Sequence, residues 1–204
     1  NLRKITEPYV FCTLFDSPVL QKKTSEIWVE GFKVEENSNI FNKNIKKDFN
    51  RKIRIGYYSA DFRNHPVGHL IVRTLELHDK SKFEVYGFYF GKKIRDDDET
   101  HKRIVKSFDK FFDINLMGDD EIVKLSRDYK IDIAIDLMVH TINHRFGIFL
   151  KKCAPIQVNF LGYPGTSGSK SIHYIIADKT VIPRKNQDFF SEKIVFLPAC
   201  YQAN

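Results

Sequence analysis

The segment "KIRIGYYSADFRNHPVGHL", residues 52–70, predicts a β-strand that leads through a short loop into an α-helix. "KIRIGYYS" is an apolar run of the length expected for a buried strand. Pro66 suits the first position of the helix. From there "PVGHLIVRTLELHD" places its apolar residues on one helical face: Val67, Leu70, Ile71 and Leu75.

The same alternation continues along the chain. Further strands are predicted in "FEVYGFYF", "FFDI", "IDIAIDLM", "IQVNFL", "HYIIAD" and "KIVFLP", and further helices in "DETHKRIVKSFD", "DDEIVKLSRDYK" and "NHRFGIFLKK". The strands are continuous apolar runs, which is typical of a sheet that is buried on both faces. We therefore expect an α/β fold with a Rossmann-like, doubly wound, mostly parallel sheet.

The chain divides into three predicted parts. Residues 1–31 form a helical segment, in which Leu20, Ile27 and Trp28 recur at helical spacing between Pro18 and Gly31. Residues 32–51 are rich in Asn and Lys and predict a linker. Residues 52–204 make up the α/β domain. The first residue is not methionine, so we expect a fragment of a longer protein.

Composition narrows the class of protein. Hydrophobic residues make up 42% of the 204, which favours a folded domain, and no apolar run reaches the roughly 20 residues of a membrane span. The three cysteines form no CxxC pair, so neither a zinc site nor a disulfide framework is indicated, and a reduced, cytoplasmic setting is expected.

The net charge of +7 raises the question of nucleic-acid binding. The lysines are dispersed, and the densest basic stretch, residues 42–54, is interpreted as a solvated linker. Nucleic-acid binding is therefore the last-ranked hypothesis, and a basic surface also suits a phosphate-bearing small molecule.

Ligands of such sheets bind beyond the carboxyl ends of the strands, and three polar loops follow predicted strands. In the first, His65 precedes Pro66 and is expected at the N-cap, where the helix dipole favours a neutral imidazole. A neutral imidazole suits a general base. The alternative is that His65 only caps the helix. His69 lies one turn further on and is expected either to line a cleft or to face solvent.

The second loop follows "DLM". Asp136 closes the strand, and His140 and Thr141 are candidates for binding a sugar or phosphate oxygen; a loop capped by polar groups is the alternative. Arg145 is expected to contact phosphate or form a surface ion pair. The third loop, "GYPGTSG", has glycines that permit close approach to a ligand, but it matches neither the P-loop nor the GxGxxG pattern.

Four segments together carry a family resemblance. They are "RIGYYSADFRNHPVGHL", "IDIAIDLMVHT", "APIQVNFLGYPGTSG" and "FFSEKIVFLPACYQAN", in that order. They resemble the O-GlcNAc transferase/SPINDLY family of glycosyltransferases, particularly its bacterial members. The start, "EPYVFCTLFDSPVLQKKTSEIW", resembles the segment that joins that family's tetratricopeptide repeats to its catalytic region. The resemblance implies the N-terminal half of a GT-B glycosyltransferase whose second half is absent.

The resemblance also assigns roles to individual residues. His65 matches the family's active-site histidine, either as a base or as a positioning group. The matches to donor-pocket positions are His140, Thr141, Leu161, Gly162 and Pro164, with His69 ranked lower. The sequence departs from the bacterial pattern at Val139, where glycine is usual, and in "PACYQAN"; a Cβ at Val139 is expected to crowd the loop or narrow the pocket.

The implied reaction is transfer of N-acetylglucosamine from UDP-GlcNAc to Ser or Thr hydroxyls of proteins. No metal or other cofactor is expected, and neither nucleic acid nor membrane is expected as a partner. The partners implied are a nucleotide-sugar, a polypeptide acceptor and, in the full protein, the missing catalytic half and upstream repeats. This fragment alone is expected to be inactive. The alternatives are GDP-fucose as donor, hexose transfer to Asn, or a noncatalytic binding module.

Overall fold

The computed structural model describes residues 6–32, 34 and 51–202. The predicted linker, residues 32–51, lies almost entirely outside the described residues. The division of the chain into 1–31, 32–51 and 52–204 therefore stays a prediction. In the described part of the chain, no helix combines the length and the apolar composition that crossing a membrane requires.

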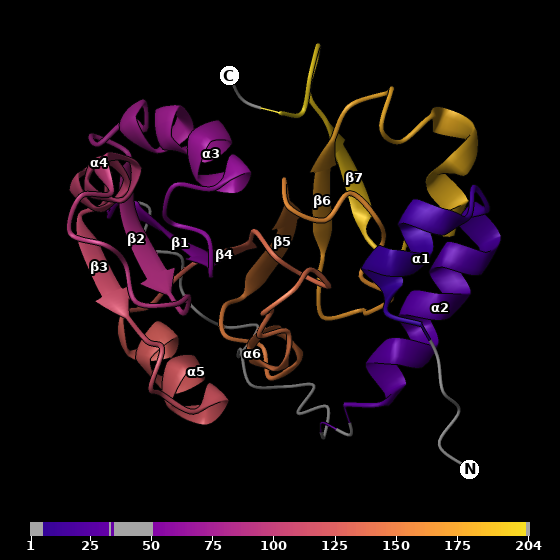
Figure 1. The fold of residues 1–204 in the computed structure, drawn as a ribbon, viewed down its shortest axis with the longest axis horizontal. Helices are drawn as coiled ribbons and strands as arrows, with labels where there is room; N and C mark the ends of the chain where they lie inside the picture. The colour runs from indigo at the N-terminus through magenta and orange to yellow at the C-terminus, as the bar shows by residue number, and fades with distance from the viewer. Residues whose placement is uncertain (1–5, 33, 35–50, 203–204) are drawn as a thin grey trace.

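A seven-stranded sheet forms the centre of the molecule, with strand order β3-β2-β1-β4-β5-β6-β7 (Figure 1). Each neighbouring pair of strands is parallel. The order β3-β2-β1-β4-β5-β6 is that of the Rossmann fold, so the predicted fold class is confirmed. The strands are β1 (Ile53–Ser59), β2 (Phe83–Tyr89), β3 (Lys110–Asp113), β4 (Ile133–Asp136), β5 (Ile156–Phe160), β6 (Tyr174–Ala177) and β7 (Lys193–Phe196).

Helices cover both faces of the sheet, as the doubly wound prediction requires (Figure 1). On one face lie α3 (Pro66–Glu76) and α4 (Glu99–Ser107), whose apolar residues share a core cluster with Ile55 and Val85. On the other lie α5 (Asp119–Asp128) and α6 (Gly147–Leu150), which pack with Tyr58 and Phe88. Successive strand residues point to opposite faces, so each strand contributes to both cores.

The predicted helix in "NHRFGIFLKK" is shorter than its apolar residues indicate. Only four residues, Gly147–Leu150, are helical. The residues before them form a loop in which Asn143 has a left-handed φ of 64° and the Arg145 guanidinium bonds the Asp119 carboxylate. A left-handed residue cannot continue a right-handed helix, so the helix begins late.

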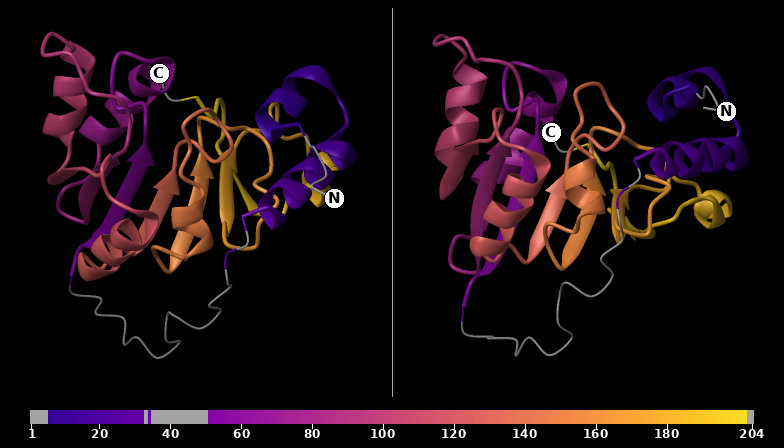
Figure 2. Two further views of the ribbon diagram at one scale, coloured as in Figure 1. Left: turned by 60° about the horizontal axis from the view of Figure 1, so that its bottom comes forward. Right: turned by 90° about the horizontal axis from the view of Figure 1, so that it is seen from below.

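The N-terminal segment forms two helices, α1 (Pro8–Leu14) and α2 (Pro18–Glu30), beside the β6–β7 end of the sheet (Figure 2). The predicted apolar stripe of α2 is wrong at Leu20, which is 48% exposed. The buried residues of α2 are instead Thr24 and Ser25. The reason is close packing, because a Cβ added to Gly168 would lie 2.8 Å from the Cβ of Ser25 and larger side chains would not fit.

The loop after β5 passes very close to the end of β4. A Cβ added at Gly162 would lie 2.0 Å from the carbonyl oxygen of Leu137 and 3.7 Å from the side chain of Val67. Only glycine permits this approach, which brings the loops after β4 and β5 against the start of α3.

We expect Gly162→Ala to lower the free energy of unfolding by about 2–3 kcal/mol, because backbone must move to admit the methyl group. Gly118→Ala is the matched control: its Cβ meets nothing closer than 3.4 Å, and its stability should stay near that of the wild type. Urea unfolding of the three proteins measures the difference. Equal stability of the two variants would contradict the close-approach argument.

Candidate functional site at the carboxyl edge of the sheet

The three loops singled out from the sequence meet at one edge of the sheet. His65 follows β1, His140 follows β4, and Gly162 follows β5. The His140 Nε2 lies 2.8 Å from the Ser167 carbonyl oxygen, which links the second loop to the third. A Cβ added at Gly162 would lie 3.7 Å from the Val67 side chain, so the third loop runs beside the start of the helix that follows the first loop. The expected convergence on a single rim is therefore present.

His65 is the N-cap of α3, as predicted. Its backbone is extended, and its Nδ1 accepts a hydrogen bond from the Val67 amide at 3.3 Å. The side chain is 32% exposed, so it reaches the surface of the rim. Partial burial lowers the pKa of His65, the Asp61 carboxylate opposes that shift, and Arg63 adds to it. The expected neutral imidazole agrees with this direction, although burial contributes most.

Asp61 is a candidate that sequence reasoning missed. Its Oδ2 lies 3.6 Å from the His65 Nδ1, and its Oδ1 accepts from the Arg63 guanidinium at 2.9 Å. The Ser59 hydroxyl oxygen accepts from the Asp61 amide at 2.9 Å and holds this turn in place. An acidic residue four positions before a histidine in a strand-end loop was the available signal. Asp61 thus connects His65 with Arg63.

His69 lies on the surface of α3. Its side chain is exposed, and its Nε2 lies 2.8 Å from the Asn64 Oδ1. Of the two environments expected from the sequence, the solvent-facing one is observed. Any contact of His69 with a donor stays a prediction.

His140 is buried, with 2% of its surface exposed. Its ring packs between Phe146 and Tyr163, with centroids 4.8 and 5.3 Å away. Because the Ser167 carbonyl can only accept, the proton resides on Nε2, and the buried Nδ1 has no partner among the described residues. Burial lowers the pKa of His140 to about 4. In this structure His140 fastens the third loop.

Val139 occupies the position where the family resemblance implies glycine. Its φ is 48°, a left-handed conformation that β-branched residues rarely adopt. The Asp136 Oδ1 accepts hydrogen bonds from the Met138 and Val139 amides and holds that turn. The Val139 side chain is fully buried in the core on the α5–α6 face. The expectation that a Cβ here crowds the loop or narrows the pocket stays a prediction.

Burial raises the pKa of Asp136 to about 7, and the two backbone amides oppose that shift. The carboxyl is therefore part of the turn that presents His140 and Thr141 and is not open to a ligand. Thr141 is partly buried, and its Oγ1 lies 3.8 Å from the Met138 sulfur.

Buried side chains hold the glycine-rich loop, residues 162–168, in place. The buried Glu192 accepts from the Thr166 hydroxyl at 2.7 Å and from the Ser167 amide at 2.6 Å, and Asn159 donates to the Gly165 carbonyl at 3.1 Å. Burial raises the pKa of Glu192. Because the Gly168 amide is also bonded, to Thr166 Oγ1, these amides are not free to hold a diphosphate.

The open part of that loop is its first turn. Pro164 is exposed, Gly162 is partly exposed, and Leu161 is buried with a left-handed φ of 74°. Strained backbone of this kind concentrates at binding sites. Gly162, Pro164 and His65 therefore form the accessible portion of the predicted site, and Leu161 lies buried beneath the turn.

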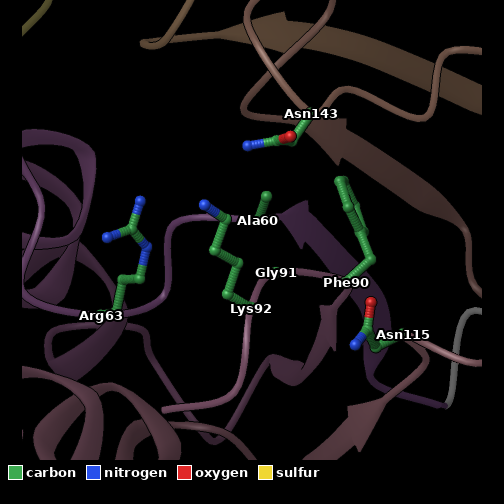
Figure 3. Close-up of a pocket in the computed structure, with 7 residues that line it drawn as sticks. All are labelled: Ala60, Arg63, Phe90, Gly91, Lys92, Asn115 and Asn143. Atoms are coloured by element: carbon green, nitrogen blue, oxygen red, sulfur yellow. The ribbon is translucent and has the colours of Figure 1, made fainter. Parts of the chain in front are cut away.

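A cavity of about 190 Å³ opens at the ends of β1 and β2, and Arg63, the partner of Asp61, is one of its lining residues (Figure 3). Two of its lining residues are cationic, and none is acidic. The lining residues are Ala60, Arg63, Phe90, Gly91, Lys92, Asn115 and Asn143.

The described residues contain no group of three or more His, Cys, Asp or Glu side chains placed to hold a metal ion. The expectation that the reaction needs no metal or other cofactor stays a prediction.

A solved structure shares this arrangement. The O-GlcNAc transferase of Thermobaculum terrenum, as a K341M mutant, superposes with a TM-score of 0.79 at 26% identity over 92% of this chain and 35% of that one. The Rossmann-like sheet with its three converging loops is thus that of a glycosyltransferase with the GT-B fold.

Residues 20–203 match the model of glycosyl transferase family 41. The chain belongs to that family. It is 38% identical over 154 residues to an Arabidopsis thaliana protein, "Probable UDP-N-acetylglucosamine--peptide N-acetylglucosaminyltransferase SEC". It is 34% identical over 150 residues to "UDP-N-acetylglucosamine--peptide N-acetylglucosaminyltransferase" of Caenorhabditis elegans. The matches cover 76% and 72% of this chain, but only 16% and 13% of those relatives.

We expect His140 to remain neutral, with its proton on Nε2, as the pH falls from 7 toward its pKa of about 4. Burial disfavours the imidazolium, and the Ser167 carbonyl selects the tautomer. Long-range ¹H–¹⁵N NMR of the ring nitrogens measures both properties. A midpoint for His140 near 6.5 would show that the ring is solvated.

Proposed function

We propose that this chain is part of the catalytic region of a protein O-glycosyltransferase. The full protein transfers N-acetylglucosamine from UDP-GlcNAc to Ser or Thr hydroxyls. The observation that carries the proposal is the convergence of His65, the His140–Thr141 turn and residues 161–164 on one rim, in a member of family 41. The activity in the names of the curated relatives supports the choice of donor and acceptor.

The reaction makes two demands on the site. The bond between the sugar and the diphosphate breaks while a bond from the sugar to the acceptor oxygen forms, so the hydroxyl loses a proton and the diphosphate gains charge. His65 is a partly exposed titratable group of the rim and serves the acceptor hydroxyl. In this proposal Leu161, Gly162, Pro164 and Thr141 contact the donor sugar. His140 holds the glycine-rich loop through the Ser167 carbonyl.

The hydrogen bonds of His65 bear on its role. Because Nδ1 accepts from the Val67 amide, a neutral ring carries its proton on Nε2. In that tautomer Nε2 donates to the acceptor oxygen and positions it. A base at Nε2 requires the proton on Nδ1, where the Asp61 carboxylate, 3.6 Å away, stabilises it. The hydrogen bond from the Val67 amide to Nδ1 favours the positioning role of His65. Asp61 is the group that makes the tautomer with the proton on Nδ1 accessible.

We expect His65→Asn in the full-length enzyme to lower turnover about a hundredfold or more. Asparagine keeps a side-chain acceptor for the Val67 amide, so folding should be retained, whereas His65→Ala also loses the cap. Peptide glycosylation with UDP-GlcNAc and thermal unfolding of both variants are the measurements. A turnover near that of the wild type in His65→Asn would remove His65 from the reaction.

Asp61→Asn separates the two roles of His65. If His65 is a base, losing the carboxylate should lower kcat and alter the acid limb of the pH–rate profile. If His65 only positions the hydroxyl, kcat should change little and the acceptor KM should carry the effect.

The donor is tested by thermal shift of the full-length protein. A donor that binds the folded state raises Tm. UDP-GlcNAc should stabilise the protein more than GDP-fucose at equal concentration; the reverse order would transfer the proposal to the fucose donor. Because the matches cover only 16% and 13% of the curated relatives, the 204-residue chain alone is expected to show no transfer.

A further inference from the structure

The cavity lined by Arg63 and Lys92 has a cationic composition that the residue roles assigned above do not use. Arg63, Lys92 and Asn143 direct their nitrogen atoms into the same space (Figure 3). Two of these groups are cations, and no carboxylate lines the cavity. We propose that this cavity binds an oxyanion, a carboxylate or phosphate group, of a ligand engaged at His65.

The cations are incompletely paired. Lys92 has no acidic partner in the described part of the chain. One terminal nitrogen of the Arg63 guanidinium donates to the Asp61 Oδ1 at 2.9 Å. The Arg63 Nε is buried and lacks a hydrogen-bond partner among the described residues. An arginine presents its donors as a planar fork that matches the two oxygens of a carboxylate or phosphate. An incoming oxyanion would accept hydrogen bonds from the Arg63 and Lys92 side chains.

The backbone around the cavity is held in place before any ligand binds. The Tyr89 hydroxyl donates to the Lys92 carbonyl at 2.5 Å, which holds the backbone of Lys92 in place. A Cβ added at Gly91 would lie 2.1 Å from the Ala60 carbonyl oxygen, so the loop after β2 runs tightly along the end of β1. Asn143 enters from the loop after β4 with a left-handed φ of 64°. Three loops thus supply one group each.

Asp61 places the cavity close to the proposed position of the reacting ligand. Asp61 contacts Arg63 through one oxygen and lies 3.6 Å from His65 through the other. A ligand whose hydroxyl is at His65 therefore has its neighbouring groups beside the cavity, an inference that rests on the proposed function. Two sources supply the required chemistry: an acidic side chain of the acceptor polypeptide, or the diphosphate of the nucleotide-sugar.

The first experiment measures anion binding without any transfer reaction. Inorganic phosphate is titrated into the full-length protein at constant ionic strength and followed by calorimetry. Lys92→Gln should weaken phosphate binding about tenfold or more, the scale of a lost charge-assisted hydrogen bond. Lys93→Gln is the matched control, since the neighbouring exposed lysine changes the net charge equally but does not line the cavity. Its affinity should equal that of the wild type.

Either of two results would overturn the proposal: no saturable phosphate binding, or equal affinities in Lys92→Gln and the wild type. Both are independent of whether the protein transfers sugar, so failure of this inference and failure of the proposed function are distinguishable.

The second experiment identifies the source of the oxyanion. UDP and a pair of Ser-containing peptides, one with Glu and one with Gln beside the serine, compete with phosphate. Competition by UDP that Lys92→Gln weakens assigns the cavity to the diphosphate. Preference for the Glu peptide, lost in Lys92→Gln but kept in Lys93→Gln, assigns it to the acceptor. Competition by neither would refute the link to His65.

Discussion

The parallel pairing of every neighbouring strand constrains where chemistry can occur in this molecule. Parallel strands all end at one edge, so the loops after β1, β4 and β5 must gather there. The crossovers between β1 and β5 contain the helices that cover both faces of the sheet, which leaves the carboxyl-edge loops free to carry polar groups. The candidate site follows from this pairing before any particular side chain is considered.

Some polar groups at the carboxyl edge of the sheet hold the loops in place, and others are accessible to a ligand. Glu192 and His140 are buried and fasten the glycine-rich loop through Ser167. His65 is partly exposed and available to a ligand. Buried hydrogen bonds stiffen the segments that they join, which suits a site that must hold reacting groups in register. Two histidines that look equivalent in the sequence therefore contribute differently.

Asp61 lies between His65, the residue proposed to engage the acceptor hydroxyl, and Arg63, which lines the cationic cavity. One of its oxygens is near the His65 imidazole, and the other bonds the Arg63 guanidinium. An anion bound near Arg63 would compete for that guanidinium and alter the field of the carboxylate at His65. Anion binding and the protonation of His65 are thus expected to be linked through Asp61.

Much of the fold was available from the sequence, because apolar runs and helical spacing are local and report secondary structure directly. The doubly wound, mostly parallel sheet, the shared edge of the three loops and the position of His65 at the N-cap follow from those patterns and from the family resemblance. The strand order is seen only in the structure. Tertiary structure alone decided that His140 is buried, that Asp61 lies beside His65, and that Thr24 and Ser25 form the packed face of α2. The physical reason is that desolvation, close packing and hydrogen bonding depend on residues distant in the chain, whose approach no local spacing records.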